Sequence, residues 1–243
     1  MSWRDTVRSR LERHGIADEI RRIRHFVRSR GGRSDRQLIA DHLSSTDEPK
    51  LQLGCGTRCF DGWLNADLSP RSLESIRLDA TKPLPFPEAT FAYVYSEHMI
   101  EHVGREAAER LCSEWFRVLR PGGRLRVSTP DLTKLLHLFG PGEWSDDQRR
   151  YAELIAVRHI PSIEPAEVQA THVLNHNVRE WGHQFLYDAP TFEAMLAAAG
   201  FVEICPHGLQ ESDDPVLCGL ANDARMPPGL VDFETMTYEA VRP

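Results

Sequence analysis

The sequence predicts an α/β fold with a mostly parallel sheet, and two observations carry this prediction. Four short runs rich in apolar and branched residues read as strands, namely KLQLGC, WLNADL, SIRLDA and FAYVYSEH. The last of them is followed by an amphipathic helix, EAAERLCSEWFRVLR, and by a fifth strand, RLRVSTPD. Strands that alternate with helices in this way are typical of a parallel sheet with flanking helices. We expect Pro121-Gly122-Gly123 to end the helix.

Three regions are expected along the chain. Residues 1–45 form a basic helical N-terminal arm, whose last helix, at residues 34–43, is capped by Ser34 or Asp35. Residues 46–131 and 181–243 form the core, in which Asp188 caps the helix TFEAMLAAAG, and FVEICPHG and PVLCGLAND read as the final strands. Residues 132–180 break the alternation with helical pieces, prolines and histidines, so we interpret them as a helical insertion over the sheet.

Composition and charge narrow the choice of partners. The chain of 243 residues has no long apolar run and no apolar segment near its start, so neither membrane insertion nor a signal peptide is expected. Five widely spread cysteines without a C-x-x-C pair favour a cytoplasmic protein over a disulfide framework. The net charge is −7, yet residues 1–36 hold 11 arginines against five acidic residues. We expect this arm to pack on the acidic body of its own chain or of a second copy as a homodimer, and we expect no nucleic acid partner.

The stretch LQLGCGTRCFDGWLNADL, residues 51–68, carries the first chemical signal. Gly54 and Gly56 follow an apolar strand, and Asp67 and Asp79 close the next two strands at the same edge of the sheet. Carboxylates at this edge can accept hydrogen bonds from ribose hydroxyls and from an adenine amino group, so the pattern predicts an adenosine site. Only about eight residues, TRCFDGWL, join the first two strands, whereas a parallel crossover normally needs about 10–12 or more. We therefore predict an abbreviated first crossover helix and a ligand without phosphates.

These motifs resemble those of class I S-adenosylmethionine-dependent methyltransferases. The likeness is narrower for a bacterial subgroup with the first motif L-x-L-G-C-G…G-W-x-N-x-D-L, and it covers about residues 50–131 and 181–204. It implies a Rossmann-like, mostly parallel seven-stranded sheet with flanking helices, and S-adenosyl-L-methionine as cofactor. It also implies the cofactor-binding residues, which are Gly54, Cys55, Gly56, Asp67, Leu68, Asp79, Ala80 and Glu97. Gln52 departs from the acidic residue that many class I enzymes have two positions before the first glycine, and Arg58 replaces a glycine.

Histidines supply the candidates for catalysis. SEHMIEHV places His98 and His102 after the fourth strand, and GHQFLYD places His183 after the insertion. A histidine there can take the proton of an acceptor hydroxyl, because its pKa lies near neutrality. We expect Glu101, His176 and Tyr187 to contact the substrate. Glu101 and His102 can equally well begin and cap the next helix.

Two metal hypotheses stay open beside this interpretation. His98-x-x-Glu101-His102 is also the motif of inverted zinc peptidases, which need both histidines on one helical face. His172, His176 and His183 with Glu180 form a second candidate set for a divalent metal, although their spacing is irregular and no metal is predicted.

The sequence thus predicts methyl transfer from S-adenosylmethionine to a small-molecule acceptor. A sugar or other secondary-metabolite hydroxyl is the expected acceptor, with residues 132–180 as a lid over its site. The competing hypotheses are a zinc metallopeptidase and a non-catalytic cofactor-binding protein.

Overall fold

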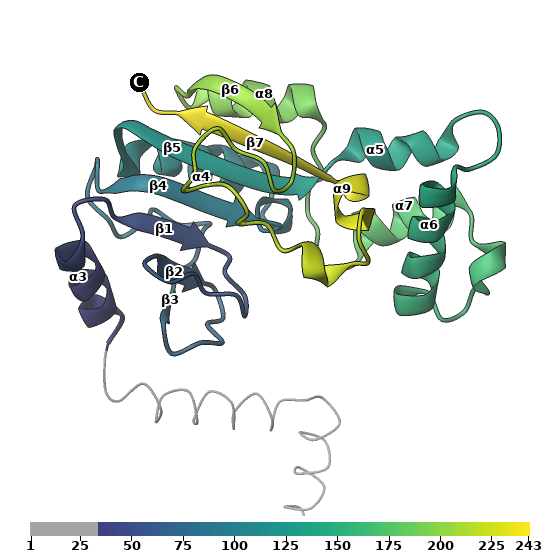
Figure 1. Cartoon of the computed structure of the whole chain (residues 1–243), viewed down its shortest axis with the longest axis horizontal. Helices are drawn as coiled ribbons and strands as arrows, with labels where there is room; N and C mark the ends of the chain where they lie inside the picture. Colours follow the sequence, from purple (N-terminus) through teal and green to yellow (C-terminus); the bar gives the residue numbers. More distant parts are fainter. Residues whose placement is uncertain (1–33) are drawn as a thin grey trace, which may run out of the picture.

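The computed structural model describes residues 34–243, and the expected helices of residues 1–33 lie outside that range (Figure 1). The first described helix, α3 (Asp35–Ser45), starts where the sequence predicted. The Ser34 hydroxyl accepts a hydrogen bond from the Gln37 amide, and the Gln37 side-chain oxygen accepts one from the Ser34 amide, which together form a capping box. None of the helices in the described range is long and apolar enough to cross a lipid bilayer.

A seven-stranded sheet in the order β3-β2-β1-β4-β5-β7-β6 forms the core. Strands β1 to β5 all run parallel to one another, whereas β7 runs antiparallel to both β5 and β6. This confirms the mostly parallel, Rossmann-like sheet. The strands are β1 (Lys50–Leu53), β2 (Leu64–Asp67), β3 (Ser75–Arg77), β4 (Phe91–Glu97), β5 (Leu119–Pro130), β6 (Val202–His207) and β7 (Thr235–Val241).

One face of the sheet is apolar and packs against helices. In-register neighbours on this face include Leu51, Val94, Leu125 and Ala240, all of which are fully or almost fully buried. They share one hydrophobic cluster with side chains of α3, α4 (Arg105–Val118) and α8 (Ala189–Ala198). Asp188 caps α8 by accepting a hydrogen bond from the Thr191 amide, as predicted.

The opposite face carries a buried row of polar side chains across five strands. The paired residues of this row are Asn65, Gln52, Tyr95, Arg126 and Glu239, each at most 4% exposed. Sheets covered by helices on both faces usually have near-continuous apolar strands. The alternation of apolar and polar residues therefore matches a sheet whose second face is covered by something other than helices.

The connection from β6 to β7, residues 208–234, covers much of this polar face. Arg126 donates hydrogen bonds to the carbonyls of Gly208, Leu209 and Glu211, and it pairs with the Glu239 carboxylate. Further along, Asp214 accepts a hydrogen bond from Tyr93. Figure 1 shows the connection crossing the front of the sheet before it reaches α9 (Leu230–Glu234).

This arrangement corrects the expected final strand. PVLCGLAND, residues 215–223, forms turns and a short 3₁₀ segment, and the last strand is TMTYEAV instead. The reason is that Arg126 and its neighbours bind the backbone of the connection over the face of the sheet. Its amides and carbonyls are therefore not at a sheet edge, where a strand would pair.

The first crossover lacks even the short helix that was predicted. No helix lies between β1 and β2 in the described structure; turns fill the segment. Phe60 and Trp63 pack there against Tyr95, with ring centroids 5.3 and 6.3 Å from the Tyr95 ring. The Asn65 side chain holds this turn by accepting from the Phe60 amide and donating to the Phe60 and Trp63 carbonyls. Aromatic rings thus do the packing that a crossover helix would do.

The end of α4 also differs from the prediction. The helix stops at Val118, before Pro121-Gly122-Gly123, because Leu119 already pairs with Phe91 in the sheet. At Gly123 a side chain is excluded, since a Cβ would lie 2.7 Å from the Arg120 carbonyl oxygen.

Residues 132–179 add helices beside the carboxyl edge of the sheet (Figure 1). They are α5 (Leu132–Leu136), α6 (Asp146–His159) and α7 (Ala170–Arg179), with short 3₁₀ turns between them. Tyr151, Ile155 and Val173 form a second hydrophobic cluster that includes Leu230 of α9. The helical segment is therefore packed against the connection from β6 to β7.

The buried Arg126 side chain allows a stability prediction. We expect Arg126→Met to lower the free energy of unfolding by about 3–5 kcal/mol, because it leaves the buried Glu239 carboxylate with only His207 Nε2, at 3.6 Å, beside it. Urea unfolding followed by circular dichroism measures this loss. Arg124→Met is the matched control: this arginine pairs with Asp214 at 3.3 Å but is 37% exposed, so its loss should cost about 1 kcal/mol or less. Equal losses in the two variants would contradict the account.

Candidate functional site

The glycine turn after β1 lies against the end of β2. Gly54 and Gly56 both have positive φ angles, and the Gly56 amide donates to Asp67 Oδ2 at 2.9 Å. A Cβ on Gly54 would lie 2.6 Å from the Met99 side chain, whereas a Cβ on Gly56 would meet nothing within 4 Å. Gly54 is thus required by protein packing, and Gly56 faces space in which a ligand can approach the backbone.

The other predicted cofactor residues line the same edge. Asp79 accepts hydrogen bonds from the amide and hydroxyl of Thr81, which lower the pKa of its carboxyl and keep it ionised. Leu68 is 56% exposed beside Asp67, and Ala80 is partly buried against the core. Burial raises the pKa of the Cys55 thiol to about 12, with Cys59 and Asp67 adding to the effect, so Cys55 is not a nucleophile near neutral pH.

The connection from β6 to β7 reaches this edge as well. Arg58 donates to the Leu220 carbonyl at 2.6 Å, and the Asn222 amide donates to Glu97 at 2.8 Å. The rim residue Arg58 therefore joins the glycine turn to a segment more than 150 residues away in sequence. Gln52, which replaces the acidic residue of many class I enzymes, is 4% exposed, and its Oε1 has no hydrogen-bond donor among the described residues.

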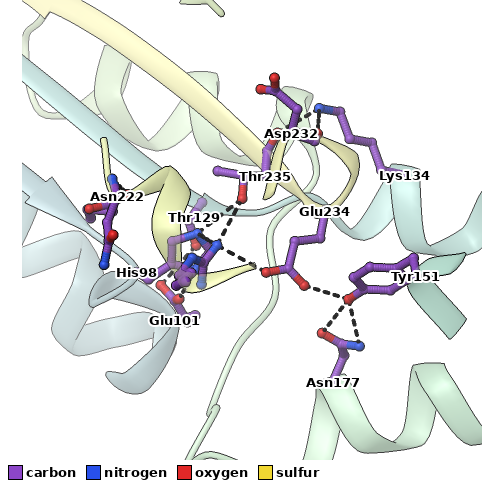
Figure 2. A network of polar contacts seen from close by, with 12 residues as sticks. His98, Glu101, Thr129, Lys134, Tyr151, Asn177, Asn222, Asp232, Glu234 and Thr235 are labelled. Carbon is purple, nitrogen blue, oxygen red and sulfur yellow. Dashed lines mark hydrogen bonds and ion pairs between the residues drawn. The ribbon is translucent and has the colours of Figure 1, made fainter. Parts of the chain in front are cut away.

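His98 is fixed by contacts at both ring nitrogens (Figure 2). Arg225 Nη2 lies 2.6 Å from His98 Nε2, and Thr235 Oγ1 lies 3.1 Å from it, while Nδ1 lies 3.0 Å from Glu101. Because a guanidinium only donates, Nε2 must accept, and Nδ1 carries the proton that is donated to Glu101. His98 also has a φ of +46°, which is rare for a residue with a side chain. Both ring nitrogens of this histidine are therefore engaged within the protein rather than offered to a ligand.

Glu101 is a fully buried carboxylate at the centre of the site. It accepts from His98 and, at 3.0 Å, from the Thr129 hydroxyl. Burial acts to raise the pKa of Glu101, but the interactions led by the hydrogen bond from His98 hold the pKa below its ordinary value. Glu101 is therefore ionised at neutral pH.

The polar network continues into the helical segment. Arg225 also donates to Glu234, whose other oxygen accepts from Tyr151, and the Asn177 side chain contacts the Tyr151 hydroxyl. Figure 2 shows Glu234 between the His98 side of the network and Tyr151. Hydrogen bonds thus link β4, the connection before β7, α6 and α7.

A cavity of about 330 Å³ opens between the sheet edge, the connection and α6–α7. His102 and His183 both line it, with ring centroids 4.9 Å apart. Glu101 offers a ligand atom within 4.8 Å of those of His102 and His183, so these three residues can share a metal ion. The further lining residues are His98, Pro130, Arg158, His159, Asn177, Trp181, Arg225, Met226 and Glu234.

Trp181 closes one side of the cavity with stacked histidines. His159 and His176 stack with centroids 5.0 Å apart, and the Trp181 ring meets both edge-on. Trp181 and Gly182 have successive positive φ angles of 57° and 80°; glycine adopts this conformation readily, whereas at Trp181 it is a backbone strain of the kind often stored at functional sites. His176, expected to contact the substrate, is 8% exposed and is not among the residues that line the cavity.

Three of these histidines are held neutral. Burial is the main cause that lowers the pKa of His159, His176 and His183 below the ordinary value of 6.5. His183 Nδ1 lies within hydrogen-bond distance of the Asn177 carbonyl oxygen, which only accepts, so Nδ1 carries the proton and Nε2 keeps its lone pair.

Tyr187 is not brought to this cavity. Its side chain is fully buried between Phe185 and Phe192, and it borders a separate groove between α4 and α8. The main-chain bridge to Asp131 turns this side chain into the core.

The sequence suggested two sets of metal ligands, and the structure does not bring the residues of either set together. His98 and His102 do not share an α-helical face, since His98 has a left-handed backbone and residues 100–102 form a 3₁₀ turn. With Arg225 bound to its Nε2, His98 cannot serve as the zinc ligand of a peptidase. His172 accepts from the Gln169 amide in a capping box on α7, away from His183.

Sequence reasoning missed the partners from the last part of the chain. Arg225, Glu234 and Thr235 contact His98 or its neighbours, yet they lie more than 125 residues from it in sequence. The pairing of the buried Glu234 with Arg225 marks this region as part of the site, but neither the burial nor the pairing can be read from the sequence.

Residues 51–127 match the family model of a methyltransferase domain. The matched range contains the glycine turn, Asp67, Asp79, Glu97 and the turn from His98 to His102. It supports a methyltransferase that depends on S-adenosylmethionine, and it does not support a peptidase. Among curated proteins, none matches the chain.

The chain is similar to solved structures of methyltransferases. A methyltransferase from Mesorhizobium loti has 17% sequence identity and a TM-score of 0.50, over 86% of this chain and 98% of that one. One from Archaeoglobus fulgidus has 13% identity and a TM-score of 0.49, over 98% and 94%. Haemonchus contortus phosphoethanolamine N-methyltransferase 2, crystallised with S-adenosyl-L-methionine, has 16% identity and a TM-score of 0.45 over 86% of this chain. The match spans 52% of that longer protein.

The neutral histidines predict how stability depends on pH. Below about pH 6.5 these histidines bind more protons in the unfolded chain than in the folded protein, where their pKa values are lower. The free energy of unfolding should therefore fall as the pH is lowered from 7.5 to 5.5. Each histidine contributes at most about 1.4 kcal/mol per pH unit. Thermal unfolding at several pH values measures the slope.

His176→Phe should flatten this slope, because it keeps an aromatic ring against Trp181 and removes one titrating group whose pKa shift Glu180 only partly opposes. His137→Ala, at an exposed histidine, serves as the control with an unchanged slope. An identical slope in wild type and His176→Phe would argue against the assignment.

Proposed function

We propose that the protein transfers a methyl group from S-adenosylmethionine to the hydroxyl of a small molecule, such as a sugar or other secondary metabolite. The observation that carries this proposal is the position of the histidine-lined cavity next to Glu97 and His98, at the same sheet edge as the glycine turn. We also propose that the chain belongs to the bacterial subgroup whose motifs it resembles.

The cofactor edge fits an adenosyl ligand. Each oxygen of the Asp67 carboxylate accepts one hydrogen bond, from the Gly56 amide or the Ser69 amide. A carboxylate has about four acceptor positions. Lone pairs therefore remain for ribose hydroxyls. Gly56 leaves open space beside this carboxylate, and Asp79 supplies a second acceptor. When bound, S-adenosylmethionine supplies an electrophilic methyl group, and the edge residues orient it.

The acceptor is proposed to lie in the cavity with its hydroxyl near His102 and His183. His98 is engaged at both nitrogens, so of the three histidines proposed for catalysis it serves by holding Glu101 and the turn that leads to His102. His183 Nε2 has a free lone pair beside the His102 ring. These two histidines therefore activate the hydroxyl.

Water exclusion and positioning are the proposed sources of rate. Residues 132–180, with the strained Trp181 turn after them, act as the lid in this proposal, and the Glu234–Tyr151 hydrogen bond holds α6 against the site. The homodimer through the N-terminal arm and the cytoplasmic location stay predictions of the sequence.

Cofactor binding is the first test. We expect S-adenosylhomocysteine to bind in isothermal titration calorimetry, and Asp67→Ala to weaken it more than about 10-fold, because hydrogen bonds to charged groups contribute about 1.5–3 kcal/mol each. Asp61→Ala, an exposed carboxylate in the same crossover, is the control and should bind normally. Absence of binding by the wild type, or normal binding by Asp67→Ala, would refute the proposal.

Activity is the second test, with a labelled-methyl screen over hydroxyl-bearing small molecules. His102→Ala and His183→Ala should each lower kcat about 100-fold or more with little change in S-adenosylhomocysteine affinity, as for loss of a general acid–base group. His137→Ala should keep wild-type activity. If both variants retain full turnover, the histidines have no part in the reaction.

A further inference from the structure

Glu101, His102 and His183 are brought together by the backbone as well as by their side chains. The Gln184 and Phe185 amides donate to the Glu101 carbonyl at 2.7 and 3.3 Å, and the Gln184 side chain donates to the His102 carbonyl at 2.7 Å. Two segments about 80 residues apart in sequence are thus joined at the point where the three side chains converge to within 4.8 Å.

The two imidazoles border the cavity together, and His183 has the outer hydrogen bond that is typical of a metal ligand. The Nδ1–H group of His183 donates a hydrogen bond to the Asn177 carbonyl, which leaves Nε2 as the atom that can bind a metal. Ligating histidines almost always donate their other N–H to a carbonyl or carboxylate in this way. The His102 ring lies across the His183 ring at 67°, and both border the cavity.

Glu101 completes the set with an oriented charge. Its two oxygens accept from His98 Nδ1 and from the Thr129 hydroxyl, so the carboxylate has a fixed direction and still has lone pairs. Arg225 donates to His98 Nε2, which leaves Nδ1 of His98 to donate to Glu101, and Arg225 itself pairs with Glu234. Among the described residues, Glu101 thus has no permanently charged partner of its own, although a buried carboxylate normally needs one.

Two histidines and one carboxylate beside open space match a catalytic rather than a structural metal centre. Such sites use three protein ligands and leave at least one position for water or substrate. Imidazole and carboxylate together suit first-row divalent ions such as Zn²⁺ better than Mg²⁺ or Ca²⁺, which prefer oxygen ligands only.

We propose that Glu101, His102 and His183 bind one divalent transition-metal ion, such as Zn²⁺, and that the acceptor hydroxyl occupies its open position. The metal site follows from the geometry alone, whereas its use on an acceptor rests on the proposed function. A bound cation lowers the pKa of an oxygen ligand. A metal bound here would activate the hydroxyl directly, with its proton released to solvent, and His102 and His183 would act as ligands of the metal instead of as the base.

The test uses the full-length protein, prepared without a histidine tag and stripped with a chelator. Calorimetry with ZnCl₂ should give about one site per chain in the wild type. His102→Ala and His183→Ala should each weaken Zn²⁺ binding by more than about 100-fold, since even loss of an outer partner of a ligand costs about 10–100-fold. His137→Ala should bind Zn²⁺ like the wild type.

S-adenosylhomocysteine is titrated into the same samples to separate the two proposals. Cofactor binding without Zn²⁺ binding would overturn the metal site and leave the methyltransferase, and Zn²⁺ binding without cofactor binding would do the reverse. Zn²⁺ binding that survives in both histidine variants would also overturn the site. Where a variant fails to fold, X-ray absorption of the wild-type zinc complex decides: two imidazole ligands at about 2.0–2.1 Å support the site, and none or one overturns it.

Discussion

The buried guanidinium of Arg126 is the constraint on which the rest of the structure depends. Arg126 lies in the middle of the sheet, fully buried, and its charge is paired with Glu239 on β7. A buried guanidinium also needs acceptors beyond one carboxylate, and the carbonyls of Gly208, Leu209 and Glu211 accept from the two terminal Nη groups of Arg126. The chain that leaves β6 is therefore drawn over the polar face of the sheet instead of turning directly into β7.

That path determines where the functional residues meet. After Arg126 the connection is held by Tyr93 at Asp214, by Arg58 at Leu220 and by Glu97 at Asn222. It arrives at the carboxyl edge with Arg225 placed against His98. One buried charge in the sheet thus positions the arginine that sets the tautomer of His98, and His98 in turn orients the buried carboxylate of Glu101.

The sequence predicted what local pattern determines. The strand ends at Gly54, Asp67 and Glu97, the capped starts of α3 and α8, and the reduced first crossover all follow from short segments whose signals are turn residues and periodicity. The prediction of PVLCGLAND as a final strand was wrong. This segment is as apolar as a strand, and only the hydrogen bonds of distant side chains keep it off the sheet edge.

The same limit applies to the motif SEHMIEHV. His98 and His102 are four residues apart and chemically identical, so sequence alone gave them the same role. The left-handed backbone at His98 directs it toward Arg225 and Thr235, whereas His102 faces His183. Which histidine is a link and which borders the cavity depends on residues from the other end of the chain.

The two halves of the site consequently have different origins in the sequence. The cofactor edge is made almost entirely by residues 51–97, which lie inside the matched methyltransferase range. The cavity needs the turn after β4, the end of α6, the Trp181 turn and the connection before β7, none of which can form it alone. Changes in α5–α7 or in residues 208–234 can therefore alter the shape of the cavity while leaving the Gly56–Asp67 hydrogen bond intact. In the proposed function, acceptor specificity and cofactor binding are therefore separable, because separate segments, linked through His98 and Glu97, build the cavity and the edge with the glycine turn.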